Sequence, residues 1–212
     1  MENFLVPAEE IRRDIQVLNS KFIAIAAPAS SVEEAQQVIR RIRSQFPDAS
    51  HHVPAYCIGH GSSVTTHCSD AGEPSGTAGR PVLAVLTGSG LGDIVVVVTR
   101  YFGGTKLGTG GLVRAYGGAA REVLDAVPRA VKSKARKASI TLDYPDYESA
   151  RMEINKSGAT ILDQNFTGDV TMDAIIPLEK YEQLAENLRN ITRGGVRIEI
   201  GDQVIDVLIP VK

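Results

Sequence analysis

The fold is indicated most clearly by residues 94–116, which read IVVVVTRYFGGTKLGTGGLVRAY. The opening run, residues 94–98, is almost entirely β-branched, and such a run is typical of a strand that is buried on both faces. A helical pattern follows over residues 112–127. Five glycines lie between them, from Gly103 to Gly111. The segment therefore predicts a buried strand that enters a helix through an irregular, glycine-rich loop.

Upstream, periodicity and turn signals predict the rest of a first α+β domain. The predicted elements are strands over residues 11–18, 22–27 and 53–58, a helix over 32–46, and a short helix that begins at Pro81. Ser30 and Ser31 each precede an acid by three residues, so the longer helix is expected to begin with a capping box. Pro54 cannot donate a ladder hydrogen bond, which indicates that its strand lies at an edge or contains a bulge.

Beyond residue 137 the pattern restarts, and it predicts a second α+β domain. Its elements follow the order βαββαβ, which is that of the ferredoxin-like split arrangement. They are strands over residues 138–142, 160–163, 170–176 and 196–200, helices over 147–156 and 178–191, and one more strand over 204–211. We therefore expect two domains, over residues 1–130 and 137–212.

Charge is spread unevenly along the chain. There are 23 Lys and Arg against 25 Asp and Glu, a net charge of −2 that excludes a uniformly basic nucleic-acid-binding protein. Residues 129–137 hold five basic residues and no acid, whereas residues 138–212 hold 7 basic and 13 acidic residues. A basic joint is thus expected between the domains, either as a solvated linker or as a contact for phosphates.

Composition also bears on location. No apolar stretch approaches the roughly 20 residues that a membrane-spanning helix needs, and the N-terminus lacks the basic start and apolar run of a signal peptide. The two cysteines, Cys57 and Cys68, are too few for a disulfide framework at this length. We expect a cytoplasmic protein with no membrane partner.

Two glycine-rich loops carry the polar residues that indicate a binding site. Fifteen of the 20 glycines lie between Gly59 and Gly118. Residues 69–81 and 99–111 each lead into a helix start, where free backbone N–H groups attract anions and nearby cations strengthen the attraction. If the two loops converge, they form a cleft for an anionic group, with no metal and no cofactor. The expected ligand-binding residues are Glu73, Ser75, Thr77, Arg80, Arg100, Tyr101, Lys106, Thr109 and Arg114.

Each of these groups has an expected role. The guanidinium and ammonium groups supply positive charge, the hydroxyl groups orient the ligand, Tyr101 stacks on it, and Glu73 positions an arginine. A structural interpretation competes with this one. In it, Arg100 pairs with Asp70 or Glu73, and Phe102 and Tyr116 belong to the core.

Known catalytic and nucleotide-binding fingerprints do not fit these loops. Residues 103–108 have the outer glycines of a P-loop but lack the following Lys-Ser/Thr, and residues 88–93 end in Asp93 where a dinucleotide fingerprint needs glycine. Ser75 does not stand in the strand-turn-helix elbow of a serine nucleophile. It and Thr77 are more simply explained as caps of the helix that follows.

All four histidines and both cysteines fall within residues 51–68. Only Cys57 and His60 approach the spacing of a zinc-ligand pair. The adjacent His67 and Cys68 would point to opposite faces of a strand. Ordinary packing is the favoured interpretation, and no metal is expected.

Both loops resemble the signatures of a known family. Residues 73–81, EPSGTAGRP, with residues 99–104, TRYFGG, and 107–116, LGTGGLVRAY, are similar to those of the IMPACT family. The similarity extends to residues 48–52 and 5–7. It implies an N-terminal ribosomal-protein-like β-α-β domain, as in elongation factor G, a ferredoxin-like second domain similar to those of that factor, and a role in the regulation of translation.

The sequence departs from the family pattern at two positions. Ala71 follows Asp70, where the family usually has a second aspartate, and this weakens a metal or acid–base role for the first loop. Val53 stands where a cysteine commonly follows the His-His pair, so a family thiol cannot be invoked there.

We therefore expect a translation-associated regulatory protein that recognises an anionic group on RNA or on a ribosome-associated protein. The alternative is a small hydrolase or transferase that acts on a phosphorylated or carboxylated metabolite in the same cleft, with Glu73 as the base. A third interpretation, a protein-docking module, predicts that the C-terminal sheet carries the contact.

Overall fold

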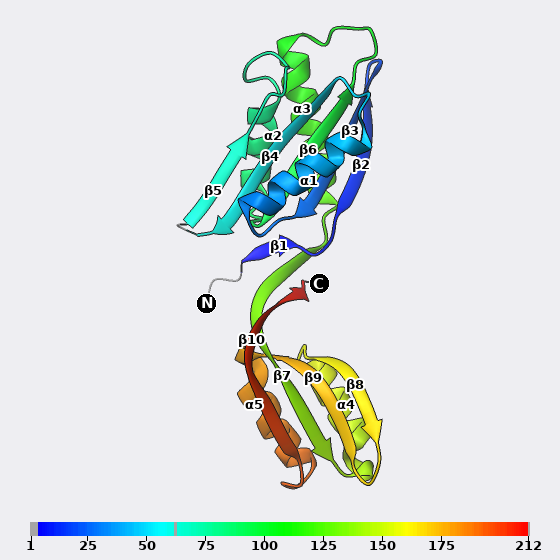
Figure 1. Cartoon of the computed structure of the whole chain (residues 1–212), viewed down its shortest axis with the longest axis vertical. Coiled ribbons are helices and arrows are strands. Elements are labelled where there is room, and N and C mark those ends of the chain that lie inside the picture. The colour runs from blue at the N-terminus through cyan, green and yellow to red at the C-terminus, as the bar shows by residue number, and fades with distance from the viewer. Residues whose placement is uncertain (1–3, 62, 212) are drawn as a thin grey trace. The chain divides into compact units, whose positions relative to one another are not determined.

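The computed structural model describes residues 4–61 and 63–211, which form two compact units (Figure 1). The first unit runs to Val131 and takes in Pro210 and Val211, and the second spans Lys132–Ile209. The division falls inside one strand, β7 (Arg129–Leu142), whose first residues pair with β1 (Leu5–Pro7). The interpretation of the basic joint as a solvated linker is therefore wrong, because residues 129–137 are β-structure.

The first unit is built on a five-stranded antiparallel sheet in the order β2-β3-β6-β4-β5. Its strands are β2 (Ile11–Val17), β3 (Ser20–Pro28), β4 (His51–His60), β5 (Ser63–Cys68) and β6 (Ile94–Tyr101). Helix α1 (Val32–Gln45) covers one face, and α2 (Gly79–Gly88) with α3 (Gly108–Asp125) covers the other (Figure 1).

Strand β6 lies in the middle of this sheet. Val96 and Val98 belong to the core beneath α2 and α3, whereas Val95 and Val97 belong to the core beneath α1. Successive side chains of a strand point to opposite faces, so the continuous β-branched run fills both layers. The prediction of a strand buried on both faces is confirmed.

Helix α1 begins with the capping box that the sequence predicts. Ser31 Oγ accepts a hydrogen bond from the backbone N–H of Glu34 at 3.1 Å, and the Glu34 carboxylate accepts one from the N–H of Ser30 at 2.7 Å. N–H groups that have no partner within the helix are thereby satisfied. Ala35, Ile39 and Ile42 then turn toward the sheet and are buried.

Strand β4 is not an edge strand, contrary to the expectation from Pro54, because it lies between β6 and β5. The Pro54 carbonyl accepts from Ser69 N at 3.2 Å, just beyond the last β5 pair, Ala55 with Cys68. The N–H and C=O of a strand residue point to the same side. The N–H that proline lacks would therefore point past the end of β5, and no bond to β6 is lost.

The second unit has the βαββαβ element order that the sequence predicts. After β7 come α4 (Tyr147–Lys156), β8 (Thr160–Phe166), β9 (Val170–Pro177), α5 (Leu178–Ile191) and β10 (Arg197–Pro210). β9 lies between β7 and β8, and β10 pairs with β7. Both helices pack against one face of the sheet around Ile140, Met172 and Leu184.

The C-terminal segment differs from its prediction. The two strands expected over residues 196–200 and 204–211 are one strand, β10, which continues through Gly201. Its exposed and half-buried residues alternate over much of its length. Pairing with β7 extends the strand through a stretch where local pattern alone indicates a break.

Candidate functional site

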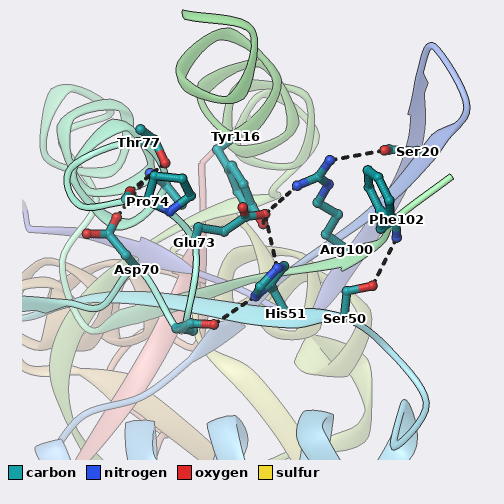
Figure 2. Close-up of polar contacts among 12 residues, drawn as sticks. Ser20, Ser50, His51, Asp70, Glu73, Pro74, Thr77, Arg100, Phe102 and Tyr116 are labelled. Carbon is teal, nitrogen blue, oxygen red and sulfur yellow. Dashed lines mark hydrogen bonds and ion pairs between the residues drawn. The ribbon is translucent and has the colours of Figure 1, made fainter. Parts of the chain in front are cut away.

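The two glycine-rich loops meet through a buried ion pair. Arg100 Nη1 donates to Glu73 Oε1 at 2.7 Å, and only 5% and 4% of these side chains are exposed (Figure 2). Tyr116, from α3, donates its hydroxyl to the same oxygen at 2.7 Å. The expected convergence of the loops is thus present, but the negative group that Arg100 holds is the protein's own. Glu73 positions an arginine, as the sequence predicts.

The Arg100 guanidinium makes further contacts with a hydroxyl group and two aromatic rings. Nη2 donates to Ser20 Oγ at 3.2 Å, and the guanidinium carbon lies 5.5 Å from the ring centre of Phe22 and 5.4 Å from that of Phe102. Nε is buried and has no hydrogen-bond partner in the described structure. A buried arginine with contacts of this kind is a structural anchor, and a ligand does not reach it from the surface.

Tyr116 remains a hydrogen-bond donor at physiological pH. Burial raises the pKa of Tyr116 far above its ordinary value, and the hydrogen bond to the Glu73 carboxylate raises it further. Tyr116 packs edge-on against Phe22, with ring centres 5.2 Å apart. The interpretation of Tyr116 as a core residue is confirmed, whereas that of Phe102 is wrong, because Phe102 is 47% exposed.

His51 borders the pair and was not among the predicted site residues. Its Nδ1 lies 3.0 Å from the Ala71 carbonyl oxygen. A carbonyl only accepts, so Nδ1 carries a hydrogen, and Nε2 faces Glu73 Oε1 at 3.7 Å. The sequence signals for His51 are its place in the 48–52 stretch that resembles the family and in the group of histidines and cysteines over residues 51–68.

Asp70 is the second residue that sequence reasoning missed. Its carboxylate accepts hydrogen bonds from the N–H groups of Gly76 at 2.8 Å, Ala78 at 3.0 Å and Gly79 at 2.8 Å. Burial alone raises the pKa of Asp70, but the bonds from these three amides outweigh it, and the pKa lies below its ordinary value. The amides at the start of α2 are therefore occupied from within and do not await an external anion.

The hydroxyl groups of the first loop do not cap α2. Thr77 Oγ1 donates to the Pro74 carbonyl at 2.6 Å, and no side chain of the cap residue, Ala78, bonds the helix. Ser75 is exposed. The expectation that Ser75 and Thr77 cap this helix is wrong, because Asp70 already takes its amides.

Tyr101 lies on the opposite face of the sheet from Arg100. Its hydroxyl donates to Asp48 Oδ1 at 3.0 Å, and its ring packs against the core beneath α1. Tyr101 therefore does not share a surface with Glu73. Its neighbour Phe102 is 47% exposed, and Ser50 Oγ accepts from the Phe102 N–H at 3.0 Å (Figure 2).

The remaining predicted residues are all at the surface. Arg80, Lys106, Thr109 and Arg114 are exposed, and none of these cations forms a salt bridge with any described residue. Helix α3 has no side-chain cap and no acid in its first turn. Its first amides thus lack the internal carboxylate that α2 has.

Two cavities of the first unit lie away from the predicted residues. One, of about 290 Å³, lies around His60 and Gly92, and another, of about 510 Å³, lies around Arg121 and Arg129. Neither is lined by any of the nine predicted residues. Of these residues, Lys106, Thr109 and Arg114 are exposed at or near the start of α3, which follows Phe102 in the chain.

The histidines and cysteines have other partners. His60 Nε2 lies 3.5 Å from Asp93 Oδ2, and His67 stacks on Tyr56 with ring centres 5.2 Å apart. Cys57 and Cys68 are free thiols, and burial raises the pKa of both. Across residues 4–61 and 63–211, no three His, Cys, Asp or Glu side chains are grouped so as to hold a metal ion.

In the same residues, none of the helices combines the length and apolarity that crossing a membrane requires.

Two domain families match the chain. The Impact N-terminal domain matches residues 18–124, and a domain of unknown function, DUF1949, matches residues 140–194. The IMPACT family member YigZ of Escherichia coli K12 is 33% identical over 199 residues, which are 93% of this chain and 98% of YigZ.

Solved structures resemble the chain to different degrees. A crystal structure of a hypothetical protein is 33% identical, covers 96% of this chain and all of its own, and superposes with a TM-score of 0.63. A structure of the two-domain translational regulator Yih1 is 26% identical over 57% of this chain and 46% of its own, with a TM-score of only 0.34. The likeness to Yih1 is too weak to carry an argument.

Proposed function

This chain belongs to the IMPACT family, and from that premise we propose that it is a translation-associated regulatory protein that binds single-stranded RNA through its second glycine-rich loop. The family resemblance supplies the translational context. The RNA assignment rests on one observation: the exposed ring of Phe102 is held by contacts with Ser50 and Arg100, and a helix start with positively charged side chains follows it in the chain.

Phe102 has the properties of a stacking platform. Its backbone is fixed by Ser50, and its ring lies against the buried guanidinium of Arg100, which is in turn held by Glu73. Nearly half of the side chain remains exposed. An unpaired base stacks readily on such a ring, and the sequence of the RNA matters little because every base has a π-face. Phe102 takes the stacking role that we predict for Tyr101 from the sequence.

The start of α3 supplies the phosphate-binding part of the proposed site. Gly108, Gly110 and Gly111 leave three of the first four residues of the helix without a side chain, and no acid stands in its first turn. Lys106 precedes these amides and Arg114 follows one to two turns later, both exposed and without an ion pair in the described residues. Backbone N–H groups at a helix N-terminus together with cations favour phosphate.

Arg80 extends the same surface. A side chain at Gly117 of α3 would come within 4.0 Å of Pro81, so the first turn of α2 packs against α3 one turn after Arg114. Arg80 and Arg114 therefore lie toward the same end of the helix pair. Three cations and one aromatic ring along this end fit a short run of nucleotides.

The buried network disfavours the enzymatic alternative. A base needs a carboxylate oxygen that a substrate can reach, and Oε1 of Glu73 already accepts two hydrogen bonds of 2.7 Å. The side chain is almost entirely buried. Glu73 is better suited to holding Arg100 and the loop than to taking up a proton.

The finer fold and location belong to the same proposal. We assign to the first unit the ribosomal-protein-like form that the family resemblance implies, as in elongation factor G, and the βαββαβ order of the second unit supports the ferredoxin-like arrangement. A role with ribosomes places the protein in the cytoplasm.

Binding of a fluorescent oligouridine, measured by anisotropy, tests the proposal. Phe102→Ala should weaken binding by about ten-fold, since stacking contributes about 1–3 kcal/mol per base. Tyr101→Phe, one residue away on the other face, is the matched control and should bind like the wild type. Equal affinities of the wild type and Phe102→Ala would remove the RNA assignment.

A further inference from the structure

Three aromatic side chains gather at the surface of the second unit, which contains no residue of the proposed RNA site. Tyr144 and Tyr147 stand at the start of α4, and Phe166 ends β8. The Phe166 ring centre lies 6.4 Å from that of Tyr144 and 5.1 Å from that of Tyr147. Tyr147 packs against the core of the unit, whereas Tyr144 is 48% exposed and Phe166 50% exposed, so these two rings face solvent.

The rings are held in place by hydrogen bonds. Tyr144 donates its hydroxyl to the Thr167 carbonyl at 2.7 Å, and Tyr147 donates to Gln164 Oε1 at 2.5 Å. Exposed aromatic rings that are already ordered lose little conformational entropy when they bind. Clusters of this kind are typical of contact sites, where aromatic residues supply much of the binding energy.

Two carboxylates flank the cluster, those of Asp143 and Asp146. Neither forms a salt bridge with a described residue, and neither caps the backbone of the turn or helix that follows it. Other acids nearby are neutralised, as when Asp169 pairs with Arg197 at 3.1 Å. The two carboxylates therefore carry negative charge that no ion pair within the described residues balances, in a unit whose residues 132–209 include 13 acidic and 10 basic ones.

We propose that Asp143, Tyr144, Asp146, Tyr147 and Phe166, the Phe166 surface, bind an arginine or lysine side chain from an extended basic segment of a partner protein. A cation placed over an aromatic face is attracted by the ring quadrupole. The neighbouring carboxylates add charge-assisted hydrogen bonds to the same cation.

The sign of the flanking charge separates the two aromatic surfaces of the chain. Phe102 is accompanied by exposed cations, which attract phosphate. Phe166 is accompanied by unpaired carboxylates, which repel it. The Phe166 surface consequently fits a basic protein segment and is unsuited to RNA.

Anisotropy of a fluorescent Arg-Gly repeat peptide with the full chain tests this inference. The wild type should bind it and should not bind the matching Glu-Gly peptide. Phe166→Ala should weaken binding about five-fold, as expected for the loss of about 1 kcal/mol of cation–π attraction. Asp143→Asn with Asp146→Asn should weaken it by a similar factor.

Two controls keep the result specific to this surface. Leu208→Ala removes a side chain of β10 that is 47% exposed, and Glu179→Gln with Glu182→Gln removes two charges from α5. Both should bind the peptide like the wild type, and thermal melts establish that each variant is folded. Failure of the wild type to bind the peptide overturns the inference. So does equal loss of binding in the α5 variant, which would indicate attraction to the whole acidic unit.

Discussion

Arg100 and Glu73 stand 27 residues apart in sequence, yet Nη1 of the one lies 2.7 Å from Oε1 of the other in a nearly dry environment. Each charge is tolerated there because the other is present. The pair ties the first glycine-rich loop to the end of β6, so both loops depend on it.

Replacing Glu73 with Gln should lower the free energy of unfolding by roughly 3–5 kcal/mol, because it leaves Arg100 buried without a counter-charge. Urea denaturation followed by circular dichroism measures this. Glu122→Gln, an exposed change on α3, serves as the control. A loss below about 1 kcal/mol would mean that water or another group balances the arginine.

Tyr116→Phe removes one of the two hydrogen bonds to Glu73 Oε1 and leaves the ring in the core. The expected cost is about 1.5–3 kcal/mol, the usual contribution of a hydrogen bond to a charged group. In a double-mutant cycle with Glu73→Gln the two losses should be less than additive, since both act on one contact. Strict additivity would show that Tyr116 acts independently of the pair.

Asp70 predicts how stability depends on pH. Its pKa is lowered in the folded state, so its contribution is complete above the pKa of the unfolded chain and is lost as the pH falls through the folded pKa. Asp14, beside Arg12 and Lys21, behaves alike with a folded pKa of about 2. Stability should therefore decline on acidification, and Asp70→Asn should decline less steeply. Parallel curves from urea midpoints measured across the acidic range would contradict this role.

Replacing Gly103 with alanine should affect stability far more than the same change at Gly110. A Cβ at Gly103 would lie 1.7 Å from the Asn19 carbonyl oxygen, whereas at Gly110 it would meet nothing within 4 Å. Gly103→Ala should push the β2–β3 turn away and weaken RNA binding along with stability. Gly110→Ala should leave stability unchanged or raise it by up to about 1 kcal/mol, because alanine favours the helix. Melting temperatures of the two variants make the comparison.

Removing a single cationic side chain of the proposed site should weaken the salt dependence of RNA binding. Lys106→Ala and Arg114→Ala should each reduce the slope of log affinity against log salt by about 0.7, the value per phosphate contact with a single strand. Arg121→Ala, further along α3, should leave the slope unchanged. Titrations at several salt concentrations provide the slopes, and an altered slope for Arg121→Ala alone would place the RNA elsewhere.

Much of the fold follows from local pattern. The β-branched run of β6 and the capping serine of α1 identify their elements because burial and capping leave direct marks in the sequence. The length of β10 does not follow. It depends on pairing with β7, and a glycine within the strand imitates a turn.

The site was predictable only in part, for physical reasons that particular residues show. Convergence of the loops and the pairing of Arg100 with an acid followed from residue type. The role of Asp70 depends on the path of the loop, which Gly72 and Gly76 set with φ angles of +88° and +77°. Whether Tyr101 or Phe102 lies beside Arg100 depends on the residue at which β6 ends and its side chains stop alternating between the two faces of the sheet. Local sequence pattern does not determine that residue.

The carbonyl of Arg129 accepts a hydrogen bond from Val211 N at 2.9 Å, while β1 lies along the same residues. Because translation proceeds from the N-terminus, a nascent chain released only as far as the first unit lacks this last bond. The first unit is thus completed by residues that leave the ribosomal exit tunnel after the whole second unit. The first unit is therefore synthesised before the second unit but gains its last residues after it.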